Sequence, residues 1–178
     1  AAALDTLALG LERGAGGAAV RALLAEAHRA ADWEGLAGLA RRAQELGADT
    51  PDVPWLLGTA LAMTGQGPDA IGELGAALDA HPAAPFAAEA HEQLAELLLE
   101  VGAFEDAIEH ARAAADLDHG STMPVIVQAR ALLSSDRTPE AEALVASSFD
   151  DDATIDDRVF LLPEPISAGY GAATGRLT

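Results

Sequence analysis

The chain has 178 residues, of which 10 are basic and 29 acidic, so its formal net charge is -19. This charge argues against a protein that binds nucleic acid or an anionic membrane, because both need clustered positive charge. The absence of cysteine excludes disulfides, iron–sulfur sites and a thiolate nucleophile, and 43 alanines with 4% aromatic residues favour helices over a sheet.

The N-terminal residues show no sorting signal or membrane segment. Ala1–Ala3 precede Asp5 without a cationic region, and no stretch has the roughly 18–20 apolar residues of a membrane span. We therefore expect a cytoplasmic protein. The missing initiator methionine suggests a processed chain or a piece of a longer one, and the use of arginine in place of every lysine suggests a GC-rich bacterial genome.

The chain repeats with a period of 34 residues, and such periods indicate repeat architectures. The clearest unit contains Trp55, Leu56, Leu57, Gly58, Leu61, Gly65, Ala70, Leu74, Ala77 and Pro82. A second copy lies 37 residues later, with three residues added near 85–87, and contains Leu94, Ala95, Leu98, Gly102, Ala107, Ala111, Ala114 and His119. More degenerate copies precede and follow these two, so that four units cover about residues 17–155.

Each unit is predicted to form two helices, because apolar residues recur at the helical spacing i, i+3, i+4 and i+7. Breaks in the middle of the units fall at 65–68 and 102–104. Prolines in a first helical turn (Pro54, Pro68) and glycines at helix ends in a left-handed conformation (Gly47, Gly65, Gly102) fit this division. Small residues predict close helix approach within a hairpin, with Gly58 against Ala70 and Ala95 against Ala107.

The unit from Trp55 to Pro82 resembles a tetratricopeptide repeat, since Leu57, Gly58, Leu61, Ala70, Leu74, Ala77 and Pro82 occupy its signature positions. The resemblance is good for 88–121 and partial for 17–50 and 122–155. It implies an all-α, right-handed helical-hairpin solenoid of about four units. It further implies that the first helix of each unit lines a concave groove for peptides or protein segments, and that there is no catalysis.

The segments before and after the repeats do not follow the repeat pattern. Residues 1–16 are expected to form an N-terminal capping helix or the second helix of a broken repeat, before a solenoid over 17–155. The irregular segment 156–178 follows an acidic spacer at 150–157 and is glycine-rich at its end. Its apolar residues 159–166 could pack on the end of the solenoid, lie in the protein's own groove or be disordered.

An acidic row is the most distinctive polar feature. Glu89, Glu92, Glu96 and Glu100 are spaced by three, four and four residues and share one helix face. The resemblance places them at or beside groove positions, where they would favour a basic ligand; the alternative is a solvated face. The same register gives further peptide-binding candidates: Arg21, His28 and Arg29; Trp55, Thr59 and Met63; and Met123, Ile126 and Arg130. Trp55 and Met63 could instead belong to the core.

The sequence gives little support to catalysis. The five histidines lack metal-ligand spacing, and no glycine-rich phosphate loop follows a strand. We therefore expect no catalytic residue, no metal and no cofactor. The predicted function is a non-catalytic module that binds a protein or peptide partner, with homo-oligomerisation left open. The alternative is a docking or oligomerisation domain of a larger bacterial enzyme or regulator.

Overall fold

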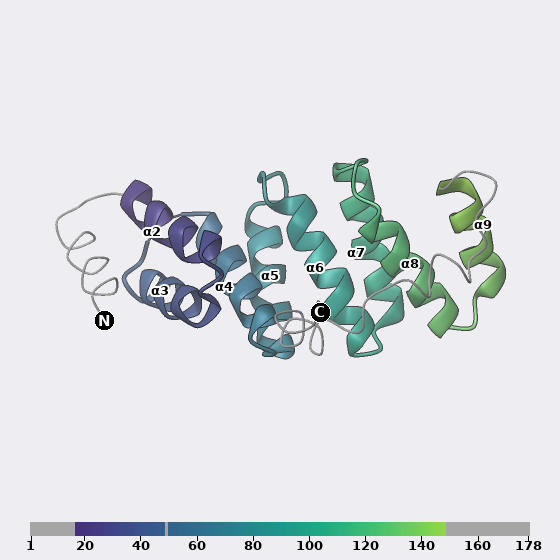
Figure 1. Ribbon diagram of the computed structural model, residues 1–178, viewed down its shortest axis with the longest axis horizontal. Coiled ribbons are helices and arrows are strands. Elements are labelled where there is room, and N and C mark those ends of the chain that lie inside the picture. The colour runs from purple at the N-terminus through teal and green to yellow at the C-terminus, as the bar shows by residue number, and fades with distance from the viewer. Residues whose placement is uncertain (1–16, 49, 149–178) are drawn as a thin grey trace, which may run out of the picture. The chain divides into compact units, whose positions relative to one another are not determined.

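The computed structural model describes residues 17–48 and 50–148, so the predictions for 1–16 and 156–178 lie outside the described residues. Within these ranges the chain forms eight helices and no strand, which confirms the all-helical fold. The helices are α2 (Gly17–Arg29), α3 (Trp33–Glu45), α4 (Asp52–Met63), α5 (Gly67–Ala80), α6 (Ala87–Glu100), α7 (Phe104–Leu117), α8 (Met123–Ser134) and α9 (Thr138–Ser148). They pair as the four expected hairpins, α2/α3, α4/α5, α6/α7 and α8/α9 (Figure 1).

The chain divides into two compact units, one ending at Phe86 and the other beginning at Ala87. The division coincides with the place where the repeat lengthens from 34 to 37 residues. Within each unit the second helix of one hairpin packs on the first helix of the next, α3 on α4 and α7 on α8. The first helices also touch one another, α2 with α4 and α6 with α8.

Local sequence signals place the helix ends. Asp32 caps α3 because its carboxylate accepts a hydrogen bond from the backbone N–H of Gly35 at 3.0 Å. Pro68 lies in the first turn of α5, where its missing N–H costs no helical hydrogen bond. No helix in the described ranges is both long enough and apolar enough to cross a membrane.

The turns inside the four hairpins share a left-handed residue. Gly65 and Gly102 have φ values of 77° and 79°, as predicted. At the equivalent positions of the first and fourth hairpins, Ala31 and Asp136 have φ values of 53° and 60°. Gly47, which follows α3, has the predicted positive φ of 68° as well. Because left-handed backbone is unfavourable for residues with a Cβ atom, the outer hairpins keep the turn geometry at an energetic cost.

The predicted close approach of α4 and α5 is present, but its partner differs from the prediction. A Cβ atom at Gly58 would lie 2.6 Å from Leu74 Cγ and 3.0 Å from the Leu74 backbone nitrogen. The nearest neighbour is thus one turn beyond the predicted Ala70, because side chains on facing helices interdigitate rather than meet at equal depth. Ala95 likewise packs in a cluster with Ala111, not with the predicted Ala107.

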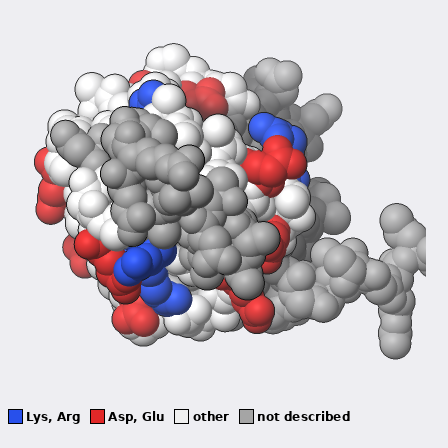
Figure 2. Space-filling view, turned by 90° about the vertical axis from the view of Figure 1, so that its left-hand side faces the viewer, with Lys and Arg blue, Asp and Glu red and all other residues white. Residues whose placement is uncertain are grey.

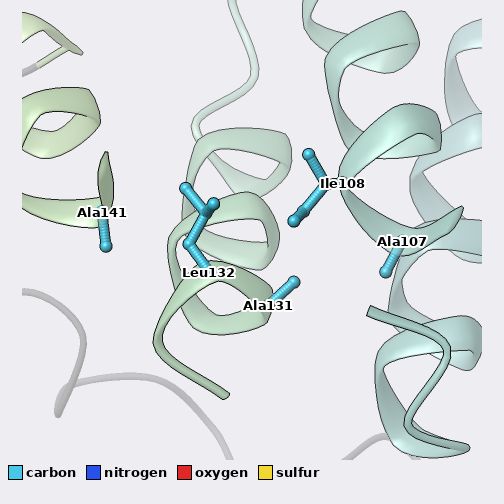
Figure 3. Packing of buried hydrophobic residues seen from close by; sticks show 5 residues of the cluster. All are labelled: Ala107, Ile108, Ala131, Leu132 and Ala141. Atoms are coloured by element: carbon cyan, nitrogen blue, oxygen red, sulfur yellow. The ribbon is translucent and has the colours of Figure 1, made fainter. Parts of the chain in front are cut away.

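One buried cluster of the second unit consists of small and branched aliphatic residues from three helices (Figure 3). Ala107 and Ile108 of α7 pack with residues of α8 and α9, and Ile108 points towards α8. Every member is at most 4% exposed. The residues contributed by α8 and α9 are Ala131, Leu132 and Ala141. The alanines let the helices approach closely while the two larger side chains fill the remaining space.

Arg137, in the turn between α8 and α9, connects two helices. Its Nη1 lies 3.1 Å from both carboxylate oxygens of Glu105 on α7. Its Nε and Nη2 lie 2.7 Å from the two oxygens of Glu140 on α9. This fork lowers the pKa of Glu140 through its hydrogen bonds to the guanidinium, and it fixes the turn at the end of the described chain.

Candidate ligand-binding surface

The predicted acidic row lies on α6 in the second unit. Glu92 and Glu96 are half-buried, whereas Glu89 and Glu100 are exposed. Because α6 and α8 lie side by side, their exposed sides form one surface. Arg130 of α8 is half-buried and close enough to Glu96 to affect its ionisation. The surface therefore joins several carboxylates and one guanidinium from two first helices.

Glu96 has the most strongly perturbed carboxyl group on this surface. Burial, and to a smaller extent the charges of Glu92 and Glu100, raise the pKa of Glu96 to about 7. Arg130 acts in the opposite direction and lowers it. Near neutral pH the Glu96 carboxyl is therefore divided between its protonated and ionised forms. A cation placed beside it would favour the ionised form.

Glu92 is held by a residue that the sequence analysis did not identify. The hydroxyl of Ser121, in the connection between α7 and α8, donates a hydrogen bond to Glu92 Oε2 at 2.9 Å. The two residues are 29 positions apart in the chain, so no local pattern joins them. The contact orients the carboxylate of Glu92 on this surface.

The first unit contains the aromatic candidates. Trp55 of α4 stacks on Phe86 with the ring centroids 5.2 Å apart and the planes 4° from parallel. His28 of α2 contacts Trp55 at 5.9 Å and meets Trp33 edge-on at 5.5 Å. We call His28, Trp33, Trp55 and Phe86 the aromatic cluster. Two of its members, His28 and Trp55, are predicted ligand contacts, whereas Trp33 and Phe86 lie outside the groove register and were not predicted.

Burial separates the remaining candidates of the first unit. Thr59 is only 3% exposed, so its side chain offers little surface to a ligand, whereas Met63 is half-buried and Arg21 exposed. Trp55 is half-buried, and its indole nitrogen is enclosed without a hydrogen-bond partner in the described part of the chain. Trp55 therefore combines a core contact with a partly accessible ring.

Two arginines of the first unit, of which only Arg29 is a predicted groove residue, pair with acidic residues. Arg29 pairs with Glu26 on α2, and Arg42 pairs with Glu45 on α3 at 2.8 Å. Figure 2 shows the same mixture, with blue arginine atoms beside red carboxylates on the face in view. Arg29 thus contributes to an ion pair rather than to a separate basic surface.

An open pocket of about 380 Å³ lies elsewhere in the first unit. It is bordered by the second helices α3 and α5, with Leu57 and Leu61 of α4 among its lining residues. The remaining lining residues are Arg41, Gln44, Pro68, Asp69, Gly72 and Glu73. None of the predicted peptide-binding residues lines it, so it is separate from the first-helix positions.

Two histidines meet between α6 and α7. The Nδ1 atoms of His91 and His110 are 2.8 Å apart and the ring centroids 5.0 Å apart. Both side chains are half-buried. Among the described residues no group of three or more histidine, aspartate or glutamate side chains is arranged to hold a metal ion. The histidine pair could not be predicted from the sequence, because the two residues are 19 positions apart and meet only when the hairpin closes.

Comparison with known proteins supports the fold. No family model and no curated protein sequence matches the chain. Among solved structures, the chain resembles the crystal structure of YrrB, described as a TPR protein with an unusual peptide-binding site. The TM-score is 0.67 at 17% sequence identity, over 82% of this chain and 74% of YrrB. The chain therefore shares the helical-hairpin fold of tetratricopeptide repeat (TPR) proteins.

Proposed function

We propose that the protein is a non-catalytic interaction module that binds a peptide or protein segment with basic side chains on the α6/α8 surface. The TPR fold supports an interaction role, and the structural neighbour YrrB is described as having a peptide-binding site. The stacked helices already hold the binding residues in place, so little conformational entropy is lost when a ligand binds.

The half-buried carboxyl of Glu96 carries the proposal. Burial and the neighbouring charges of Glu92 and Glu100 disfavour its ionised form. A guanidinium or ammonium group beside it offsets this repulsion and forms charge-assisted hydrogen bonds. Glu92, whose Oε2 accepts from Ser121, supplies a second carboxylate on the same helix face. An arginine side chain fits this arrangement well, because its planar donors can engage two carboxylates at once.

The proposed binding releases a proton near neutral pH. With the pKa of Glu96 at about 7, only about a tenth of the carboxyl groups are ionised at pH 6 and about half at pH 7. If only ionised Glu96 binds the cation, affinity rises about fivefold between pH 6 and pH 7 and less than twofold above that. Calorimetry in buffers of different ionisation enthalpy measures the released proton directly.

Selection from a library of random peptides displayed on phage tests the ligand class without a known partner. The purified chain is expected to enrich peptides with arginine or lysine, and Glu92→Gln/Glu96→Gln is expected to lose that enrichment. The matched control, Glu109→Gln/Glu142→Gln, removes the same charge from exposed positions of α7 and α9 and should retain it. Equal enrichment by both double variants would refute the α6/α8 surface as the site.

A further inference from the structure

The histidine pair occupies positions that are aliphatic in two other hairpins. The residues 34 positions after His91 and His110 are Val125 and Leu144. In the first hairpin, 71 positions earlier, the equivalent residues are Val20 and Leu39, which are 1% and 6% exposed. The repeat therefore does not need polar side chains here. At these positions the third hairpin instead has two titratable groups, which meet between its helices.

The geometry admits one proton between the rings. At a separation of 2.8 Å, one Nδ1 must carry a hydrogen and donate it while the other accepts with its lone pair. When both rings are protonated, both Nδ1 atoms carry hydrogens and no acceptor remains. Two positive charges then face each other at hydrogen-bond distance. The doubly protonated state is incompatible with the closed contact.

The neighbouring charges do not neutralise this repulsion at His91. Burial lowers the pKa of His91, and the charge of His110 lowers it further. Arg130, the one charged residue of α8, acts on Glu96. The other charged residues on the two helices of the hairpin are Glu89, Glu92, Glu96 and Glu100 on α6, and Glu105, Asp106, Glu109, Arg112 and Asp116 on α7. Of these, Asp106 lies one turn before His110, and it is exposed to solvent.

We propose that His91 and His110 form a pH-sensitive contact that holds α6 against α7 at neutral pH and opens in mild acid. The direction of the pH dependence follows from the linkage between protonation and stability. A histidine whose pKa is lowered in the closed state contributes stability above its ordinary pKa of about 6.5 and loses it as the pH falls further. Acid therefore separates the two helices by adding the second proton to the pair.

The opening also affects the proposed ligand site, in a step that rests on the proposed function. The same helix carries His91 and the carboxylates of Glu92 and Glu96. When α6 separates from α7, these carboxylates lose their fixed relation to Ser121 and α8. A basic ligand is then released in acid for two reasons, protonation of Glu96 and loosening of α6.

Hydrogen exchange measured by mass spectrometry between pH 5.5 and 7.5, corrected for intrinsic exchange rates, tests the contact without any ligand. The test is made in the Glu96→Gln background, because Glu96 lies on the same helix and titrates in the opposite direction. In this background, amides of α6 and α7 should open roughly tenfold more often at pH 5.5 than at pH 7.5, for one histidine that titrates on opening. The variant His91→Val/His110→Leu carries the aliphatic pair of the fourth hairpin and should lose this pH dependence. Helices α2–α5 of the same molecule provide an internal reference.

Two controls make the result specific. His119→Ala removes an exposed histidine that bonds the backbone oxygen of Ala115, and it should leave the pH dependence intact. With Glu96 present, the increase in acid should be smaller or reversed, because the raised pKa of Glu96 stabilises the closed state as the pH falls. If His91→Val/His110→Leu opens with the same pH dependence as the natural chain, the proposal is overturned. The single variant His91→Gln repeats the test should the double variant fail to fold.

The exchange experiment and the peptide selection separate the two proposals. If exchange shows the predicted pH dependence but the chain enriches no basic peptides, only the proposed ligand site is refuted.

Discussion

Gly58 and Leu74 bring the two helices of the second hairpin into direct contact, since a Cβ atom at Gly58 would lie 2.6 Å from Leu74 Cγ. The equivalent positions in the third hairpin, 37 residues later, are Ala95 and Ala111, which share one buried cluster. The second hairpin thus places a glycine against a leucine, whereas the third places two alanines together.

This contact predicts that a side chain at position 58 clashes with Leu74, and that a smaller residue at position 74 relieves the clash. Gly58→Ala should lower the free energy of unfolding of the first unit by about 1–3 kcal/mol, because neither the Leu74 side chain nor its backbone can easily move. Gly58→Ala/Leu74→Ala recreates the pair of the third hairpin and should cost less than the sum of the single changes. Urea denaturation followed by tryptophan fluorescence measures this, since both tryptophans, Trp33 and Trp55, lie in the first unit.

The matched control is Gly72→Ala on α5. A Cβ atom there would meet no atom within 4 Å, so the change should instead stabilise the helix by about 0.5–1 kcal/mol. Destabilisation by Gly72→Ala, or none by Gly58→Ala, would contradict the packing described for this hairpin.

Replacing Ala31, the left-handed turn residue of the first hairpin, with glycine should stabilise the protein. Ala31 has a φ of 53°, which costs a residue with a Cβ atom about 1–2 kcal/mol. Ala31→Gly should remove this cost, and after the larger entropy of the unfolded chain is subtracted, the gain should be about 0.5–1 kcal/mol. The control Ala76→Gly, at an exposed position inside α5, should destabilise by a similar amount. Thermal unfolding of the two variants would show shifts of opposite sign; a shared sign would disprove the argument.

Phe86 should stabilise the aromatic cluster of the first unit. It is 5% exposed and stacks on Trp55, so Phe86→Ala should cost about 3–5 kcal/mol. The emission of Trp55 should also shift to longer wavelength as water reaches the ring. Phe104→Ala, at a half-buried position in the second unit, is the control and should leave the emission spectrum unchanged. An unaltered spectrum for Phe86→Ala would show that the stack does not shield Trp55 in solution.

Glu96 should make the protein less stable as the pH rises. Its pKa is raised from 4.5 to about 7 in the folded chain, so its contribution is fully present below pH 4.5 and is lost as the pH rises through about 7. The loss above pH 7 amounts to as much as about 3 kcal/mol. Glu96→Gln removes it, and the variant should be more stable than the natural chain at pH 8.

Denaturation at pH 5 and pH 8, followed by far-ultraviolet circular dichroism, measures the predicted change. The advantage of Glu96→Gln should be larger at pH 8 than at pH 5. Glu109→Gln, which removes an exposed carboxylate from α7, should show little dependence of its effect on pH. An advantage of Glu96→Gln that is the same at both values would mean that Glu96 does not titrate in this range.

Much of the fold follows from the sequence because its signals are local. Helical spacing of apolar residues, first-turn prolines and glycines at helix ends act within a few residues of one another. They gave the four hairpins and the positive φ of Gly47, Gly65 and Gly102. The 34-residue period also places Ala31 and Asp136 at the turn positions that Gly65 and Gly102 occupy in the inner hairpins. Closely approaching helices also followed from the sequence, because small residues at repeat positions leave room for backbone contact.

The partners across each hairpin were decided by the tertiary structure. The predicted partners of Gly58 and Ala95 were one turn away from the observed ones, since the relative depth of two packed helices depends on every side chain between them. The same reason applies to the histidine pair and to the Ser121–Glu92 hydrogen bond, whose members are 19 and 29 residues apart. The row of carboxylates on α6 was visible in the sequence. That Glu96 is the member of the row whose pKa burial raises to near neutrality depended on how α6 packs, because burial cannot be obtained from spacing alone.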